Sequence, residues 1–247
     1  MPCLLNKGWT ARLGQQRKEG FKMDIQTVNR ISGDVEIRNI IVSVADKTGL
    51  DFLIPGLLSI NPELKIYSTG GTYGRIQEIV GENHSEILVA ISDYTGQPEM
   101  QGGLVKTLDF RLYLGLLSET YNPAHLADLE RTEAVEFDMV VVNLYPFDKA
   151  ISKAGSTVED ARGNIDIGGP CMLRAAAKNF LRVAPICEPQ DYSRIVDQLK
   201  RGAGRLTVTD RLTYAKKAFA HTAEYESAIS AYFANVAAGE ITDTYKI

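Results

Sequence analysis

Apolar and polar positions follow one another along this chain in an order that predicts strands alternating with helices. Residues 39–44 form a continuous run rich in β-branched side chains, which is typical of a strand buried on both faces. A polar turn at residues 45–49 and an apolar segment at 50–54 come next, and they predict a turn and a helix. Residues 64–67, 68–72 and 73–80 repeat this order. Such alternation builds a parallel sheet, so the pattern predicts an α/β fold.

Later segments extend the pattern. Residues 86–91 and 138–144 predict two more strands, and 182–187 predicts a shorter strand that Pro185 places at a sheet edge. Helices are expected at residues 122–131, 191–201 and 209–237, with a cap at Thr157 for a short helix. We expect an extension at residues 1–36 that is partly disordered, one α/β domain at 37–236, and a tail at 237–247. Met23 is a plausible alternative start.

Composition narrows the class of protein. The chain of 247 residues is 45% hydrophobic and 23% charged, as in ordinary globular proteins. A net charge of −4 gives no reason to expect a nucleic-acid partner, and no apolar run is long enough to predict a membrane span. Three scattered cysteines suggest reduced thiols and hence a cytoplasmic protein. The three histidines lie far apart in the sequence, so we expect no metal site.

Two loops carry candidate chemistry. Residues 68–72 offer hydroxyls and backbone N–H groups at the end of a strand, as a phosphate cradle requires, and Lys47 adds a positive charge. Residues 164–179 place Asp166 before two glycines and a helix whose first N–H groups can receive an anion or an oxyanion. Arg174 and Lys178 share a face of that helix. The same stretch is also compatible with a plain glycine-bearing loop before a surface helix.

Six segments then occur together and in order: residues 43–49, 69–72, 105–108, 143–147, 165–169 and 173–179. As a set they resemble the inosine monophosphate (IMP) cyclohydrolase domain of the bifunctional purine biosynthesis protein, over about residues 37–235. The resemblance implies a methylglyoxal-synthase-like fold, with helices on both faces of a mainly parallel sheet and a helical C-terminal extension. It also implies that the protein closes the ring of a 5-formamido-imidazole-4-carboxamide ribotide to give IMP and water.

Site residues follow from the resemblance position by position. The implied catalytic group is Lys106, Tyr145, Asp166 and Lys178. The implied substrate-binding group is Ser43, Asp46, Lys47, Thr69, Gly70, Gly71, Thr72, Thr107, Asn143, Ile167 and Gly168. No cofactor or metal is needed for an intramolecular dehydration. Because the chain ends at Ile247, we expect a stand-alone cyclohydrolase linked to a separate formyltransferase or formyl ligase; a homo-oligomer is left open.

Three positions depart from the family pattern. Leu104 stands where an arginine is usual, Asp109-Phe110 replaces His-Pro, and Ala45 replaces a serine. These changes reduce positive charge where a phosphate or base is expected, so a catalytically inactive ribotide-binding regulatory module is the alternative. A lyase of the methylglyoxal-synthase type is a third interpretation. The helix geometry conflicts with a shared role for Asp166 and Lys178. Lys178 lies ~12 Å along the helix axis from Pro170, so it can join Asp166 only if the substrate lies along the flank of the helix or the turn folds back.

Overall fold

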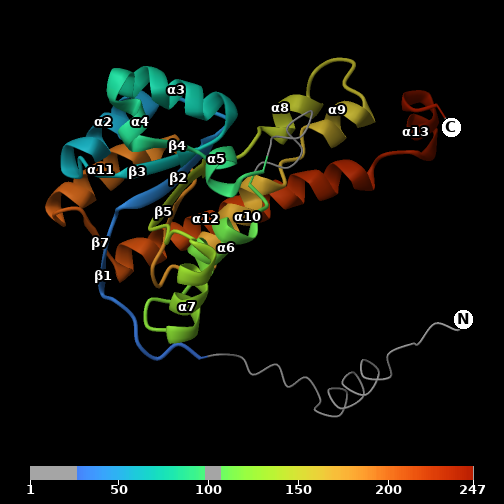
Figure 1. Ribbon diagram of the computed structural model, residues 1–247. Coiled ribbons are helices and arrows are strands. Elements are labelled where there is room, and N and C mark those ends of the chain that lie inside the picture. The colour runs from blue at the N-terminus through green and yellow to red at the C-terminus, as the bar shows by residue number, and fades with distance from the viewer. Residues whose placement is uncertain (1–26, 98–106, 247) are drawn as a thin grey trace, which may run out of the picture. The chain divides into compact units, whose positions relative to one another are not determined.

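A computed structural model describes residues 27–97 and 107–246, and residues 31–246 lie in one compact unit. Its centre is a five-stranded, fully parallel sheet in the order β4-β3-β2-β5-β6 (Figure 1). Its strands are β2 (Asn39–Val44), β3 (Lys65–Ser68), β4 (Leu88–Ala90), β5 (Met139–Asn143) and β6 (Ala184–Ile186). A two-stranded antiparallel ribbon pairs β1 (Asp34–Glu36) with β7 (Arg205–Thr207). The predicted α/β class is confirmed.

Helices cover both faces of this sheet. The longer ones are α2 (Leu50–Ile60), α3 (Gly70–Val80), α6 (Phe110–Leu117), α7 (Pro123–Thr132), α10 (Gly168–Lys178), α11 (Tyr192–Arg201) and α12 (Val208–Ala234). The shorter ones are η1 (Gly81–Asn83), α4 (His84–Ile87), α5 (Ile91–Thr95), α8 (Phe147–Ile151), α9 (Val158–Gly163), η3 (Pro189–Asp191) and α13 (Ala238–Thr244). Within the described residues, no helix is both long and apolar enough to cross a membrane.

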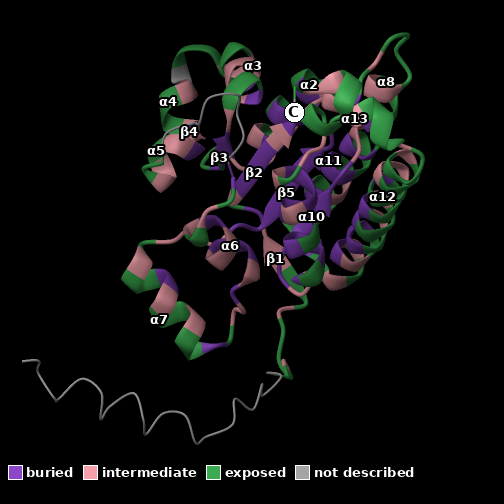
Figure 2. Cartoon of the chain, turned by 90° about the vertical axis from the view of Figure 1, so that its right-hand side faces the viewer, coloured by how far each residue is buried: buried purple, intermediate pink, exposed green. Residues whose placement is uncertain are grey.

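The core has two halves because side chains of a strand alternate between its faces. Ile40 and Val42 of β2 pack with buried residues of α2 and α11 on one face. Ile41 packs with buried residues of α6, α10 and α12 on the other. The purple strands lie between these helical layers in Figure 2. Burial on both faces explains why the central strands have continuous apolar sequences rather than alternating ones.

Some predicted elements needed correction. The strand expected at residues 86–91 is only three residues long, and Ile91 instead begins α5. Pairing with β3 stops at Ala90, and Gly96 ends the short helix with a φ of 71°. The pattern also gave no sign of α6 or of the β1–β7 ribbon. β1 and α13 lie outside residues 37–236, yet β1 pairs with β7 and α13 packs on α9.

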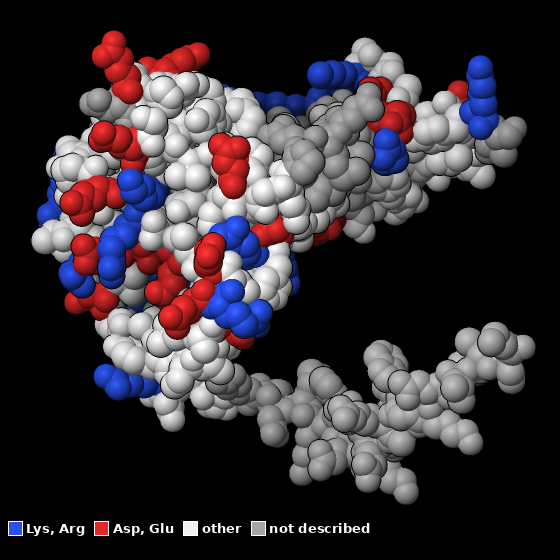
Figure 3. Space-filling model, viewed as in Figure 1, with Lys and Arg blue, Asp and Glu red and all other residues white. Residues whose placement is uncertain are grey.

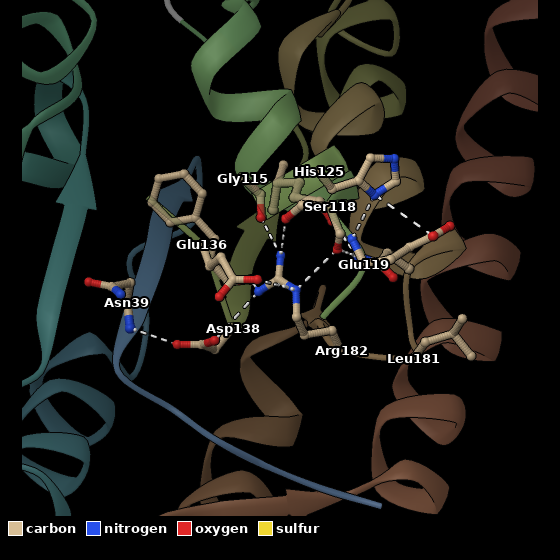
Figure 4. Close-up of polar contacts among 12 residues, drawn as sticks. Asn39, Gly115, Ser118, Glu119, His125, Glu136, Asp138, Leu181 and Arg182 are labelled. Carbon is tan, nitrogen blue, oxygen red and sulfur yellow. Dashed lines mark hydrogen bonds and ion pairs between the residues drawn. The ribbon is translucent and has the colours of Figure 1, made fainter. Parts of the chain in front are cut away.

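Arg182 is buried at the end of the sheet where β2, β5 and β6 begin, and it makes several polar contacts there (Figure 4). Its guanidinium donates to the carbonyls of Phe137 at 2.9 Å, Ser118 at 3.2 Å and Gly115. Asp138 lies 3.6 Å from the same guanidinium, and its other oxygen accepts the N–H of Asn39 at 3.0 Å. Burial lowers the pKa of Arg182, whereas its acidic neighbours oppose that change. The cluster therefore ties the end of α6 to the starts of β2, β5 and β6.

On the face of the described domain drawn in Figure 3, acidic and basic side chains are interspersed. That mixture agrees with the small net charge of −4. No single-sign field across this face would steer a ligand from a distance.

We predict that Arg182→Met lowers the free energy of unfolding by about 3–5 kcal/mol, because it leaves buried acceptors and an uncompensated Asp138 carboxylate. Denaturant unfolding measures the change. Arg201→Met is the matched control, since Arg201 is exposed and makes one 3.3 Å hydrogen bond to its own helix. It should stay within about 0.5 kcal/mol of the parent. Equal losses for both variants would show that the cluster contributes nothing special.

Candidate active site

A cavity of about 510 Å³ opens where β2, β3 and β5 end. Open parallel sheets place their ligand sites at this edge. Residues from four segments line the cavity: Ser43, Val44, Ala45 and Lys47 at and after the end of β2, residues 69–72 after β3, Asn143 and Tyr145 at and after the end of β5, and residues 163–169 leading into α10. Thr107, Leu108 and Met172 complete the wall.

Asn143 fixes the loop after β2. Its side-chain oxygen accepts the N–H of Asp46 at 2.9 Å, and its side-chain nitrogen donates to the Asp46 carbonyl at 2.7 Å. The amide thus imitates a neighbouring strand and holds Asp46 by its backbone. The Asp46 carboxylate turns away to accept the N–H of Thr48, and hydrogen bonds from the side chain and the backbone of Thr48 hold the pKa of Asp46 below its usual value. Both hydrogen-bonding ends of Asn143 are used within the fold.

Thr72 ties α3 to the same loop. Its hydroxyl accepts the N–H of Val44 at 3.1 Å and donates to the Val44 carbonyl at 3.0 Å. The side chain is 4% exposed, so this pair of bonds is shielded from water. Thr72 therefore sets the distance between the end of β2 and the start of α3.

One end of the cavity is suited to an anion. The first turn of α3 has no side-chain cap, and no acceptor in the described part of the chain takes the N–H groups of Gly70 and Gly71, so a helix start that favours negative charge is available there. Lys47 reaches over this turn: a Cβ built on Gly71 would lie 3.7 Å from the Lys47 nitrogen. The hydroxyls of Ser43 and Thr69, 3.5 Å apart, face the same space.

Asp166 lies at the other end, before α10. Burial raises the pKa of its carboxyl group, and N–H groups of Gly169, Gly168 and Tyr145 offset part of that rise. The Gly169 N–H donates to Asp166 Oδ1 at 2.9 Å. A carboxyl group with a raised pKa exchanges protons more readily near neutral pH than an exposed aspartate does. Tyr145 and Ile167 are both exposed at the mouth of the cavity.

Two glycines allow the close approach around Asp166. A Cβ on Gly168 would lie 2.3 Å from the Thr107 hydroxyl oxygen. A Cβ on Gly169 would lie 2.5 Å from Asp166 Oδ2 and 2.7 Å from a methyl carbon of Leu144. Neither gap admits a side chain without displacement of a cavity residue.

Most residues implied by the resemblance meet at this cavity. They are Ser43, Lys47, Thr69, Gly70, Gly71, Thr72, Thr107, Asn143, Tyr145, Asp166, Ile167 and Gly168. Asp46 does not line it, because its carboxylate is engaged with Thr48. Lys178 is not brought there either: it is exposed at the far end of α10, ten residues or ~15 Å of helix from Gly168. Lys106 and Leu104 lie outside the described residues.

Asp109, one of the departures from the family pattern, has a structural use. It caps α6 by accepting the N–H of Arg111 at 2.8 Å, and its other oxygen accepts from the Gln97 side chain at 2.9 Å. An aspartate is among the preferred residues at this position. Asp109 does not line the cavity, so its charge is directed into the loop and helix rather than at a ligand.

Sequence reasoning gave several wall residues no individual role. Gly163, Asn164 and Ile165 line the cavity just before Asp166, and Gly169 and Met172 follow it. All but Gly163 lie within the candidate stretch 164–179, so their adjacency to Asp166 in sequence was the available signal. Tyr225, in the helix expected at residues 209–237, received no role at the site, but its hydroxyl accepts the Asp166 N–H at 2.8 Å. No local pattern links these two residues, which are 59 positions apart.

The fold and cavity define an MGS-like α/β domain. The MGS-like domain model matches residues 55–171, and the model of the AICARFT/IMPCHase bienzyme matches residues 176–247. The chain belongs to the AICARFT/IMPCHase bienzyme family, of which it carries the MGS-like domain. This confirms the methylglyoxal-synthase-like fold and the predicted family.

Individual relatives agree with this assignment. The bifunctional purine biosynthesis protein PurH of Leptospira biflexa is 40% identical over 199 residues, which are 81% of this chain and 37% of that protein. The PurH protein of Leuconostoc citreum is 45% identical over 78% of this chain and 36% of its own length. The crystal structure of ForH superposes with a TM-score of 0.66 at 30% identity, over 80% of this chain and 97% of that one. The chain therefore spans little more than a third of the PurH relatives.

We predict a pH-dependent stability cost at Asp166. Because its folded-state pKa lies above the unfolded value of about 3.9, the cost is absent below that value and complete above the folded pKa. Replacement by asparagine removes the charge, so Asp166→Asn should gain stability relative to the parent as pH rises from about 4 to about 8. Each unit of pKa elevation corresponds to about 1.4 kcal/mol. Denaturant unfolding at both pH values measures it; a pH-independent difference would contradict the prediction.

We also predict that Gly169→Ala costs about 1–3 kcal/mol, because the new methyl group must push aside Asp166 or Leu144. Gly74→Ala in α3 is the control, since a Cβ there meets nothing within 4 Å. That variant should be neutral or more stable by up to about 1 kcal/mol, as alanine is the better helix former. Thermal and denaturant unfolding compare the two variants. An unchanged free energy of unfolding in Gly169→Ala would mean that the loop can shift to accommodate the methyl group.

Proposed function

We propose that this protein is an IMP cyclohydrolase acting in purine biosynthesis, which closes the ring of 5-formamido-1-(5-phosphoribosyl)imidazole-4-carboxamide with loss of water. One observation carries the proposal: a cavity joins a helix start that suits an anion to a partly buried carboxyl group with a raised pKa. The family assignment supports the same reaction. The relatives that match are named bifunctional purine biosynthesis proteins.

The shape of the substrate suits the two ends of the cavity. The phosphate would be held by the start of α3 and by Lys47. The ribose would lie beside the Ser43 and Thr69 hydroxyls. The imidazole with its carboxamide and formamide groups would then lie towards Asp166 and the exposed apolar surfaces of Tyr145 and Ile167.

The reaction needs proton transfers and one stabilised oxyanion. The carboxamide nitrogen attacks the formyl carbon, and we assign Asp166 to take the proton that this nitrogen loses. Negative charge develops on the formyl oxygen. The Gly169 N–H already donates to Asp166, whereas no acceptor within residues 27–97 and 107–246 takes the N–H of Ile167. We assign that N–H to the oxyanion.

Loss of water completes the balance of atoms. The oxygen must receive two protons, both of which the substrate nitrogens release as the ring becomes aromatic. Asp166 can relay one of them, and the Tyr145 hydroxyl at the cavity mouth can relay the other. A formyl-transferring enzyme must supply the substrate, and we place the reaction in the cytoplasm.

The test is to incubate the protein with the formylated ribotide and to follow IMP by absorbance. We predict turnover by the parent chain and a loss of about 10²–10⁴-fold in Asp166→Asn, as expected for a positioned proton-transfer group. Lys216→Ala is the control, because Lys216 is exposed on α12 and does not line the cavity. If the parent binds IMP without turnover, the protein is the regulatory ribotide-binding module; if it neither binds nor turns over, the proposal fails.

The same assay decides the role of Lys178. The resemblance implies that this lysine transfers a proton, but within one chain it does not line the cavity. A loss of about 10²-fold or more in Lys178→Ala would identify it as catalytic and would require a second copy of the chain or another placement of α10. Turnover equal to that of Lys216→Ala would leave proton transfer to Asp166 and Tyr145.

A further inference from the structure

Tyr225 contacts the backbone of the cavity-lining segment 164–166 without lining the cavity itself. It lies on α12 and is 9% exposed. Its hydroxyl accepts the N–H of Asp166 at 2.8 Å and donates to the carbonyl of Asn164 at 3.4 Å. One phenol therefore contacts the backbone on both sides of Ile165, in the segment that carries the carboxyl group at the cavity.

The ring of Tyr225 contacts a second cavity segment. It packs edge to face on Phe147, with ring centroids 6.5 Å apart at 75°. Phe147 is the first residue of α8, and Tyr145 precedes it by two residues. Tyr225 thus lies between the segment that carries Tyr145 and the segment that carries Asp166.

Asp166 is held through its carboxylate and through its backbone. The carboxylate meets the N–H groups of Gly169 and Gly168 in its own loop and helix, and that of Tyr145 in the segment after β5. The backbone N–H of Asp166 donates to Tyr225, which comes from α12. The contact with Tyr225 therefore fixes the backbone of the loop relative to a helix, which the contacts to the carboxylate do not do.

We propose that Tyr225 is a positioning residue: its hydroxyl holds residues 164–166 so that the Asp166 carboxyl group stays at the cavity wall. The catalytic consequence of this inference rests on the proposed function, whereas the structural consequence does not. Nothing in the hydrogen bonds requires Tyr225 to touch the substrate, and it does not line the cavity.

The chain provides a matched pair of variants. Tyr225→Phe removes only the hydroxyl and keeps the ring on Phe147. Tyr232→Phe does the same two helical turns later, where Tyr232 packs on the same Phe147 at 5.8 Å and 86°. Within the described part of the chain, the Tyr232 hydroxyl makes no hydrogen bond to the loop. The two variants therefore separate the hydrogen bond from the ring packing.

For ring closure we expect Tyr225→Phe to lower kcat by about 10–100-fold with KM within about threefold, because a displacement of about 1 Å can cost 10²-fold in rate. We also expect the limb of the pH–rate profile that Asp166 controls to move to lower pH. A loosened loop admits water and lowers the pKa of Asp166 towards its ordinary value. Among the described residues, the titratable side chains near enough for the Asp166 charge to raise their pKa are Tyr113 of α6 and Tyr225 itself. Tyr232→Phe should change neither quantity.

Amide hydrogen exchange tests the inference without any substrate. The Asp166 and Gly169 amides should exchange at least tenfold faster in Tyr225→Phe than in Tyr232→Phe. The two variants are compared under conditions in which their unfolding midpoints are equal, so that a difference in global stability does not contribute. Faster exchange in a parent chain that shows no turnover would support the positioning role while the proposed function fails. Unchanged exchange and an unchanged pH limb in Tyr225→Phe would overturn the inference. So would equal effects in the two variants, because ring packing alone would then explain them.

Discussion

The parallel register of three strands is the constraint on which the cavity depends. Val42 of β2 lies opposite Ser68 of β3, and Val44 lies opposite Asn143 of β5. β2 and β5 therefore end level with each other, and β3 ends opposite Val42, two residues before the end of β2, so the three loops share the same space. Asn143 lies beside the loop after β2. Its side-chain amide forms with the Asp46 backbone the pair of hydrogen bonds that a neighbouring strand would otherwise form. The cavity is in this sense a product of backbone pairing before any side chain contacts a ligand.

The two ends of the strands differ in how a charged side chain is compensated. At the edge where strands begin, Arg182 is buried but donates to three carbonyls and faces Asp138, so its charge is compensated. At the edge where strands end, Asp166 is partly buried beside N–H groups, and its pKa remains raised. A charge whose burial is incompletely compensated costs stability, and proteins tolerate such costs at functional sites.

Local sequence patterns predicted what local physics determines. The buried runs at β2 and β5, the edge position of β6, the helix expected from Asn122 and the cap at Thr157 depend on neighbours in the chain. The short strand β4 and the β1–β7 ribbon depend on partners far away, so periodicity could not reveal them. The same division applies to the site. Its loops could be recognised from glycines and hydroxyls, but the inward use of Thr72 and Asn143 and the outward direction of Lys178 follow from packing.

The length of α12 explains how a distant residue can act on the cavity. The helix has 27 residues, and a capping box between Thr207 and Asp210 fixes its start. One turn later, Arg211 is fully buried and donates to carbonyls that include those of Ser32 and Leu181. Tyr225 lies 14 residues beyond Arg211, or ~21 Å along the axis. A rigid helix anchored at Arg211 can therefore define where the Tyr225 hydroxyl lies, and through it where the Asp166 backbone lies. α12 thus connects an anchored end at Arg211 with the segment that carries Asp166, in addition to packing on the core.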